Sequence, residues 1–372
     1  MNEPAGRRIK RFKRLRMSTP KFLNSAGSTF YTDLKKRVSD YFIQSKIPAT
    51  GNFGLYFKAV FFWVSYVTLY LNVVFFTPPM GIAIVECFLM GGLTAAIGFN
   101  VMHDGGHGSF SNSKFWNKIA AFSVNALGAS GIMWNNKHNI IHHTYTNISG
   151  VDDDIEIKPM LRMCPSQKKY KIHRFQHIYV WFLYTLLLII WVFATDYTKY
   201  FRKKVGSVTI KRMTSFEHFA FWIAKVGYAF MMIVLPIILL GFVKWLLGFL
   251  IISMFAGFVL SIVFQLAHTV EETTFPVPDA DINRIENEWA IHQVETTANF
   301  ATKNKLISWL VGGLNFQIEH HLFPKISHIH YPAISKIIKQ TCQEYGIRYV
   351  EFPKMRHAIV SHAMHLKKMG RS

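Results

Sequence analysis

Cysteine is scarce in this chain, and its three cysteines (Cys87, Cys164 and Cys342) lie far apart in the sequence. No two of them have the spacing of a disulfide framework or of a thiolate metal site, so we expect free thiols and a reducing compartment. The first 30 residues contain no apolar run, and we therefore expect no cleaved signal peptide. The sequence also lacks internal repeats and low-complexity segments.

Acidic residues are half as frequent as basic ones, with 21 Asp and Glu against 42 Lys and Arg and a formal net charge of +21. Yet 51% of the residues are hydrophobic, and 33 of them are phenylalanine. The apolar residues form long blocks that carry almost no charge, and the basic residues lie between the blocks. A bilayer imposes this separation, so we predict an all-α, polytopic membrane protein.

Five blocks approach the roughly 20 apolar residues that a crossing needs. Four of them are predicted to cross the membrane as two helical hairpins with very short turns: 59–77 with 81–102, and 219–243 with 245–267. The fifth block, 178–195, has basic residues on both flanks, and we predict an interfacial or buried helix there, on the cytoplasmic face. The crossings place a membrane domain over residues 57–350, between a basic N-terminal segment (1–56) and a basic C-terminal tail (351–372).

The distribution of Lys and Arg predicts the orientation. The first 56 residues contain twelve basic and three acidic residues, whereas the turn at 78–80 has no charge and the turn after Val243 has only Lys244. The N-terminus and the interfacial helix are therefore expected on the cytoplasmic side. The basic stretch Arg7–Arg16 is interpreted as a solvated tail near anionic headgroups, and no nucleic-acid-binding module is recognised in it.

The N-terminal segment also contains an amphipathic pattern. Phe30, Leu34, Val38 and Phe42 would share one face of a helix. We predict that this helix lies on the membrane surface; packing against a cytoplasmic cap is the alternative.

Histidine is abundant, and eight of the 17 residues fall in four places that the predicted topology puts on one membrane face. They are His103 and His107; His138, His142 and His143; His268; and His320 and His321. Residues four apart share a helix face and can reach one metal ion, whereas neighbours in a doublet point about 100° apart and can serve two ions. The set predicts a binuclear metal site in a cytoplasmic helical cap. The other nine histidines are expected to be surface, packing or ligand-orienting residues.

Other residues near the clusters have open interpretations. Gln317, three residues before His320, is either a weaker ligand or a partner that orients a ligand. The acidic run Asp152–Asp154 either orients histidines or forms a solvated loop. Gly91, Gly92 and Gly98 would permit close helix packing on the second crossing. Imidazoles without thiolates suit iron, copper or zinc, and a binuclear, oxygen-activating site beside a lipid-facing domain favours iron.

Three motifs resemble the histidine boxes of the membrane fatty acid desaturases, especially the front-end branch and its bacterial acyl-CoA desaturase relatives. They are His103-Asp-Gly-Gly-His107, His138-Asn-Ile-Ile-His142-His143 and Gln317-Ile-Glu-His320-His321. The resemblance extends over about residues 30–350 in order and spacing, and glutamine at the start of the third box is its most branch-specific feature. The second box has three residues before its doublet instead of the usual two, which keeps His138 and His142 four residues apart.

The resemblance implies a non-haem di-iron centre with O2 as co-substrate, two electrons from an external donor, and a cis double bond formed in an acyl-CoA or acyl-lipid. By the same resemblance all eight clustered histidines would be iron ligands, and His268 is included because related enzymes have a histidine at the end of the last crossing. A His-Pro-Gly-Gly haem motif is absent, so a separate ferredoxin or cytochrome b5-like donor is expected. A bacterial inner membrane is the expected location.

Two other functions remain open at this point. A lipid hydroxylase on the same scaffold would use similar ligands. A non-enzymatic metal transporter would need polar residues along the crossings, and 59–77 and 245–267 have no charged residue. No motif specifies the double-bond position or the chain length.

Overall fold

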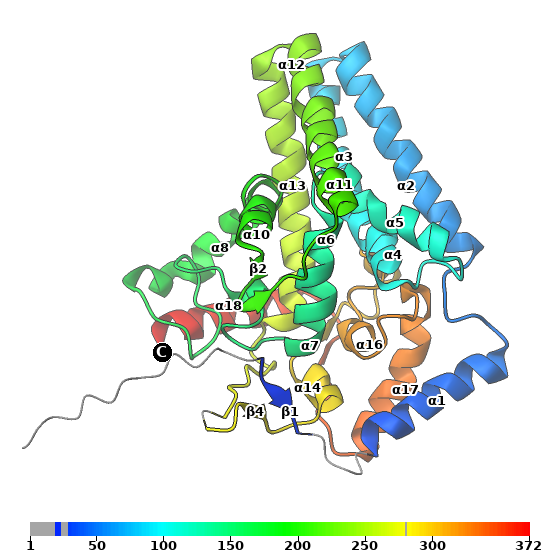
Figure 1. Ribbon diagram of the computed structural model, residues 1–372, viewed down its shortest axis with the longest axis vertical. Coiled ribbons are helices and arrows are strands. Elements are labelled where there is room, and N and C mark those ends of the chain that lie inside the picture. Colours follow the sequence, from blue (N-terminus) through cyan, green and yellow to red (C-terminus); the bar gives the residue numbers. More distant parts are fainter. Residues whose placement is uncertain (1–18, 24–28, 280) are drawn as a thin grey trace, which may run out of the picture.

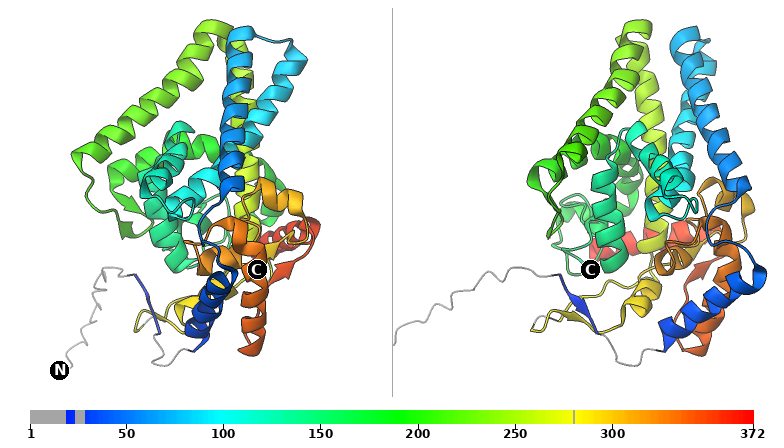
Figure 2. Two further views of the ribbon diagram at one scale, coloured as in Figure 1. Left: turned by 90° about the vertical axis from the view of Figure 1, so that its right-hand side faces the viewer. Right: turned by 45° about the vertical axis from the view of Figure 1, so that its right-hand side comes forward.

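The computed structural model describes residues 19–23, 29–279 and 281–372, so the stretch Arg7–Arg16 lies outside the described residues. The described chain is mainly helical. Two helical hairpins extend from one end, and a cap of shorter helices gathers at the other (Figures 1 and 2).

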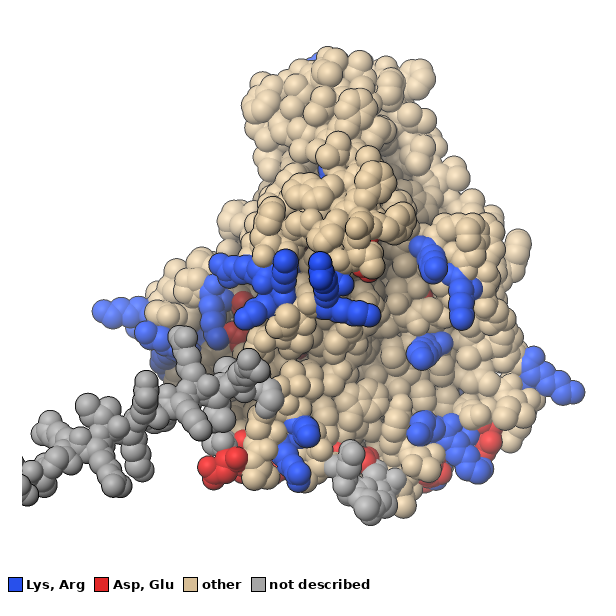
Figure 3. Space-filling view, viewed as in Figure 1, with Lys and Arg blue, Asp and Glu red and all other residues tan. Residues whose placement is uncertain are grey.

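Four long apolar stretches form the hairpins. Each stretch is one unbroken helix, and three of the four contain a π-helical segment. In chain order they are α2 (Phe53–Leu71) with η1 (Asn72–Phe76); α3 (Met80–Ile97) with η2 (Gly98–Met102) and α4 (His103–His107); α11 (Ser215–Ala229) with η7 (Phe230–Val234) and α12 (Leu235–Leu240); and α13 (Phe242–His268). All four are long and apolar enough to cross a membrane, which confirms the predicted crossings. Lys and Arg are rare on the hairpin half in Figure 3 and frequent below it.

The hairpins meet along α3 and α13. A Cβ on Gly91 would lie 2.8 Å from the carbonyl oxygen of Ile252, so only glycine permits this approach. At Gly92 and Gly98 a Cβ would make ordinary contacts of 3.6 and 3.8 Å. Close packing through small residues is therefore confirmed at one of the three predicted glycines.

The segment between the hairpins lies against the base of the bundle. It contains these helices: α5 (Lys114–Ala126), α6 (Gly131–Asn135), η3 (Asn136–His142), α7 (His143–Tyr145), η4 (Asp153–Ile155), η5 (Lys171–Phe175), α8 (Gln176–Thr185), α9 (Leu187–Ile190), η6 (Trp191–Thr195) and α10 (Asp196–Arg202). The predicted single helix 178–195 is instead bent by 62° at Leu186. It packs on α13, where the carbonyl oxygen of Thr185 lies 2.6 Å from the position of a Cβ on Gly257.

The cap is built from α1 (Phe30–Ser45), α14 (Trp289–Glu295), α15 (Lys305–Leu310), α16 (Gln317–Leu322), η8 (His328–His330), α17 (Tyr331–Glu344) and α18 (Met355–Arg371). Short strand pairs tie distant segments together: β1 (Lys21–Phe22) parallel to β4 (Arg284–Ile285), β2 (Lys204–Val205) antiparallel to β3 (Val208–Thr209), and β5 (Asn299–Phe300) parallel to β6 (Glu351–Phe352).

Helix α1 corrects one prediction. Its apolar face does not lie against lipid, because Phe30, Leu34 and Val38 are buried in a cluster with Ile334 and Ile338 of α17. The structure confirms the alternative interpretation, in which the helix packs on the cap. An amphipathic face looks the same in sequence whether lipid or another helix covers it.

The C-terminal segment is also not a tail. Residues 351–352 form β6, and α18 buries Ala358, His362 and Leu366 against the base of the bundle. Gly370 packs so closely on the carbonyl group of His173 in η5 that a side chain has no room. The basic composition therefore belongs to the exposed side of a packed helix.

Candidate metal centre

Eight histidines converge where the hairpins meet the cap. Five elements provide them: α4 provides His103 and His107, η3 provides His138 and His142, α7 provides His143, the last residue of α13 is His268, and α16 provides His320 and His321. Figure 1 shows α4, α7 and α16 around the lower end of α13. All but His107 are buried, and His107 is half-buried. The structure thus brings together all eight histidines predicted from the sequence.

The ring nitrogens form overlapping groups whose members lie within 4.8 Å of one another. One group joins His103, His107, His138 and His320, another joins His142, His268 and His321, and a third joins His143, His320 and His321. His142 and His143 belong to different groups, and His320 and His321 each belong to a different end group as well as sharing the third, because neighbouring rings on a helix point in different directions. The arrangement has two ends with His143 and His320 between them, as a binuclear site requires.

The second box has an unexpected local structure. Residues 136–142 form the π-helix η3, in which a turn is longer than in an α-helix. The four-residue spacing of His138 and His142 therefore does not direct both to one ion, and they belong to opposite groups. Instead, the Nε2 atoms of His138 and His143, five residues apart, lie 3.3 Å from each other. The presence of the ligands was predictable, but their pairing was not.

The buried nitrogens fit a metal site. The Nε2 atoms of His107, His142, His268, His320 and His321 are buried and have no hydrogen-bond partner among the described residues. The Nε2 atoms of His103 and His138 lie only 3.1 Å apart. Buried polar atoms rarely stay unpaired, and metal ions would satisfy these inward-pointing nitrogens.

The opposite ring nitrogens are held by the protein. Nδ1 of His142 lies 3.1 Å from Asp152 Oδ2, that of His268 lies 3.3 Å from the Thr296 carbonyl oxygen, that of His320 lies 3.2 Å from Tyr331 Oη, and that of His321 lies 2.8 Å from Gln293 Oε1. Such contacts fix the tautomer and the orientation of each ring, and leave Nε2 for the metal. The acidic run does orient a histidine: Asp152 is fully buried, and Asp154 pairs with Lys137.

Burial keeps most of these rings neutral. It lowers the pKa of His138, His143, His320 and His321 well below 6.5, and repulsion between neighbouring imidazoles lowers it further. Burial also acts to lower the pKa of His142, but the carboxylates of Asp152 and Asp154 outweigh it, so the net shift is upward. Neutral imidazole is the form that binds a metal ion.

A match to the fatty acid desaturase family model covers residues 77–353, which include all eight histidines. The chain belongs to this family. It is 35% identical to the sn-1 linoleoyl-lipid 6-desaturase of Arthrospira platensis over 92% of each chain. It is 35% identical to the enzyme of the same name from Synechocystis, over 95% of this chain and 98% of that one. The acyl-lipid (8-3)-desaturase of Physcomitrium patens is 33% identical over 96% of this chain and 75% of its own.

The chain is therefore a fatty acyl desaturase and an oxidoreductase. Membership of the family excludes the metal-transporter alternative. The histidine clusters are compatible with the di-iron centre for which the family is known. The four apolar helices make this desaturase a membrane protein.

Several residues around the desaturase's centre carry no motif signal. Gln293, Thr296 and Tyr331 contact ligand histidines from separate places in the sequence. Among the nine remaining histidines, His328 lies with its Nδ1 3.0 Å from Asp104, the residue after His103. These contacts come from long-range packing, so local spacing gives no sign of them.

The glutamate of the third box has a supporting role. Glu319 is fully buried and accepts hydrogen bonds from Asn299 Nδ2 and Tyr349 Oη at 2.7 Å each. Burial raises its pKa to about 7. It joins α16 to β5 and to the segment before β6, and so holds the doublet in place.

A hollow of about 360 Å³ opens beside the desaturase's centre, between α4, α5 and α6. Trp134 separates it from the histidines, with its ring centroid 4.8 Å from that of His138 and 5.8 Å from that of His107. The indole therefore shields one end of the centre from this opening.

Asp152 provides a test of ligand orientation. We expect Asp152→Asn to lower desaturation about 10- to 100-fold, since the amide replaces the carboxylate that holds His142. Bound metal and product formed per hour would be measured on the same preparation. Asp281→Asn, a change on the exposed loop before β4, is the control and should leave both unchanged. An Asp152→Asn enzyme with normal metal content and normal rate would contradict the role.

Proposed function

We propose that this desaturase uses O2 and a di-iron centre to introduce a cis double bond into the acyl chain of a membrane lipid. The observation that carries the proposal is the convergence of eight imidazoles, seven of them buried, into two end groups that a third group links through His320 and His321. His103, His107 and His138 would hold one iron ion, and His142, His268 and His321 the other. His143 and His320 lie between these two sets of histidines and would complete the coordination of the irons.

The bound irons would supply an oxidant that is strong enough to remove hydrogen from an unactivated methylene, which side-chain acid–base chemistry cannot do. Loss of two hydrogens from adjacent carbons, with reduction of O2 to two waters, takes two further electrons and two protons. The protein's own residues orient the ligands through Asp152, Thr296, Tyr331 and Gln293. They also bury the centre, which excludes bulk water.

Gln317 is proposed to act through His268. It lies at the start of α16, is 3% exposed, and its amide is close enough to the His268 ring to influence it electrostatically. This places the amide beside the group of His142, His268 and His321. It either orients His268 or becomes a weak ligand of the same iron.

An acyl-lipid is the proposed substrate class. Support comes from the relatives in Arthrospira platensis and Synechocystis, whose names specify a linoleoyl-lipid and position 6 and which match this chain over nearly its full length. A chain that already has a double bond would then gain another nearer its carboxyl end. Acyl-CoA is the alternative carrier of the same acyl group.

A separate ferredoxin or cytochrome b5-like protein is the proposed electron donor. The net charge of +21, with basic side chains gathered below the hairpins in Figure 3, favours an acidic partner on that side. The same charge distribution supports a cytoplasmic centre, since positive residues accumulate on that face of a membrane protein. We propose the inner membrane of a bacterium as its location.

Product analysis tests the function. We expect expression in a host that contains linoleoyl-lipids but no 6-desaturase to yield an acyl chain with one more double bond, located by mass spectrometry of a derivative. Separate analysis of lipid and acyl-CoA fractions at early times would identify the carrier. A hydroxylated product would assign the hydroxylase reaction instead, and an unchanged lipid profile with a metal-loaded protein would contradict the proposed substrate.

A further inference from the structure

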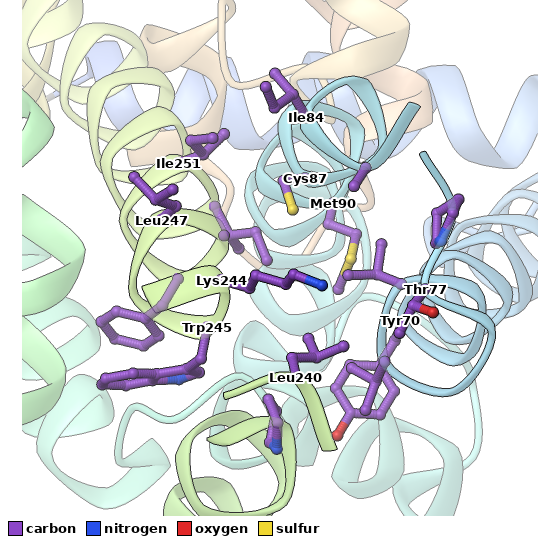
Figure 4. A pocket seen from close by; sticks show the side chains of 18 of the residues that line it. Tyr70, Thr77, Ile84, Cys87, Met90, Leu240, Lys244, Trp245, Leu247 and Ile251 are labelled. Carbon is purple, nitrogen blue, oxygen red and sulfur yellow. The ribbon is translucent and has the colours of Figure 1, made fainter. Parts of the chain in front are cut away.

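The cavity with the most distinctive lining lies far from the histidines, between the two hairpins at the end that carries their turns. It has a volume of about 390 Å³ (Figure 4). The first hairpin contributes Tyr70, Thr77 and Cys87, among others, and the second contributes Leu240 and Leu247. The hydrogen bond from Tyr70 Oη to the Met231 carbonyl oxygen, at 2.5 Å, ties the hairpins together beside it.

The lining is almost entirely apolar, apart from one cation. Lys244 extends into the space between the hairpins, and its amine points toward Thr77 in Figure 4. No ion pair or hydrogen bond joins the Lys244 side chain to any residue within 19–23, 29–279 or 281–372. It lies in the first turn of α13, where the helix dipole also disfavours a positive charge.

The position of Lys244 along α13 indicates which part of a lipid lies beside it. Helix α13 has 27 residues and a length of about 40 Å, which exceeds the roughly 30 Å of bilayer hydrocarbon. With His268 at one membrane face, the start of α13 reaches the headgroup layer of the other face. A lysine there lies at the level of lipid phosphates, while the apolar cavity extends into the hydrocarbon layer beside it.

We propose that this cavity is a binding site for an anionic phospholipid. One acyl chain occupies the space between the hairpins, and the lipid phosphate pairs with Lys244. A cavity of this size lies within the usual range for small-molecule sites, and its lining suits a hydrocarbon chain. The lipid would fasten the two hairpins to each other on the side where α12 and η1 meet, remote from the catalytic centre. This site is independent of the proposed substrate and reaction.

Binding to the full-length protein tests the proposal. The probes are phosphatidylglycerol and phosphatidylcholine with identical chains, and oleate, each added to delipidated protein in detergent while the midpoint of thermal unfolding is followed. We expect phosphatidylglycerol to raise the midpoint at lower concentration than phosphatidylcholine. Lys244→Gln should lower the affinity for phosphatidylglycerol about fivefold, because it removes one attraction between a lysine and the headgroup. Lys203→Gln, which removes an exposed lysine at the end of α10, should leave this affinity unchanged.

A second pair of variants tests the cavity without a change of charge. Ala83→Phe places a ring in the cavity and should reduce phosphatidylglycerol binding, whereas Val85→Phe, on the exposed face of the same helix, should not. The proposal is overturned if phosphatidylcholine binds as tightly as phosphatidylglycerol, if Lys244→Gln or Ala83→Phe binds like the unmodified protein, or if oleate alone reproduces the full effect. The last result would assign the site to a free fatty acid.

Discussion

Replacing His143 by alanine is expected to abolish desaturation and to lower the metal content of the purified protein. His143 lies between the two ends of the histidine cluster, with its ring centroid 4.5 Å from those of both His320 and His321 and 4.8 Å from that of His107. Its loss removes a nitrogen that both proposed iron sites adjoin. The rate should therefore fall by more than the roughly 100-fold that marks the loss of a residue which only orients a ligand.

The measurement compares product yield and iron per chain for His143→Ala and for His357→Ala, an exposed histidine of α18 outside the cluster. The control should keep both values. If His143→Ala retained full activity, the assignment of the metal site would be wrong. If activity fell while both irons remained bound, His143 would not be a ligand.

Hydropathy and the histidine set were strong enough in the sequence to predict the crossings and the members of the centre. A bilayer demands long uncharged helices, and that demand is visible residue by residue. Eight histidines in four places are equally visible. What the spacing could not reveal is how the rings are divided between ions, because the π-helix over 136–142 changes the angle between His138 and His142.

The cap was less predictable, because its helices depend on partners far away in sequence. Leu34 of α1 is buried against α17, about three hundred residues later in the chain. The C-terminal helix did leave a signal: Ala358, His362, His365, Leu366 and Met369 recur at helical spacing, and all are buried. Treating those histidines as part of an apolar face would have predicted α18 as a packed helix.

Lys225 gives the largest expected effect on stability. Its Nζ lies 2.7 Å from Asp196 Oδ2, and the ammonium also donates to the carbonyl oxygens of Gly128 and Val192. Both charged side chains are almost completely buried, so either charge without the other would be costly. Lys225→Met should therefore lower the free energy of unfolding by about 3–5 kcal/mol, since it leaves the Asp196 carboxylate uncompensated.

The expected loss of stability is large because Asp196 links several helices. Its carboxylate also accepts hydrogen bonds from the Ser130 backbone N–H and from Trp191 Nε1, so one ion pair links α11, α10 and the start of α6. Thermal unfolding in detergent would measure the loss, with Lys211→Met, at an exposed position before α11, as the control. The double variant Lys225→Met/Asp196→Asn should recover much of the stability, because it removes the stranded charge. The single variant Asp196→Asn completes the comparison. If the double variant lost as much free energy of unfolding as Lys225→Met and Asp196→Asn lose together, the cost would come from packing and not from the uncompensated carboxylate.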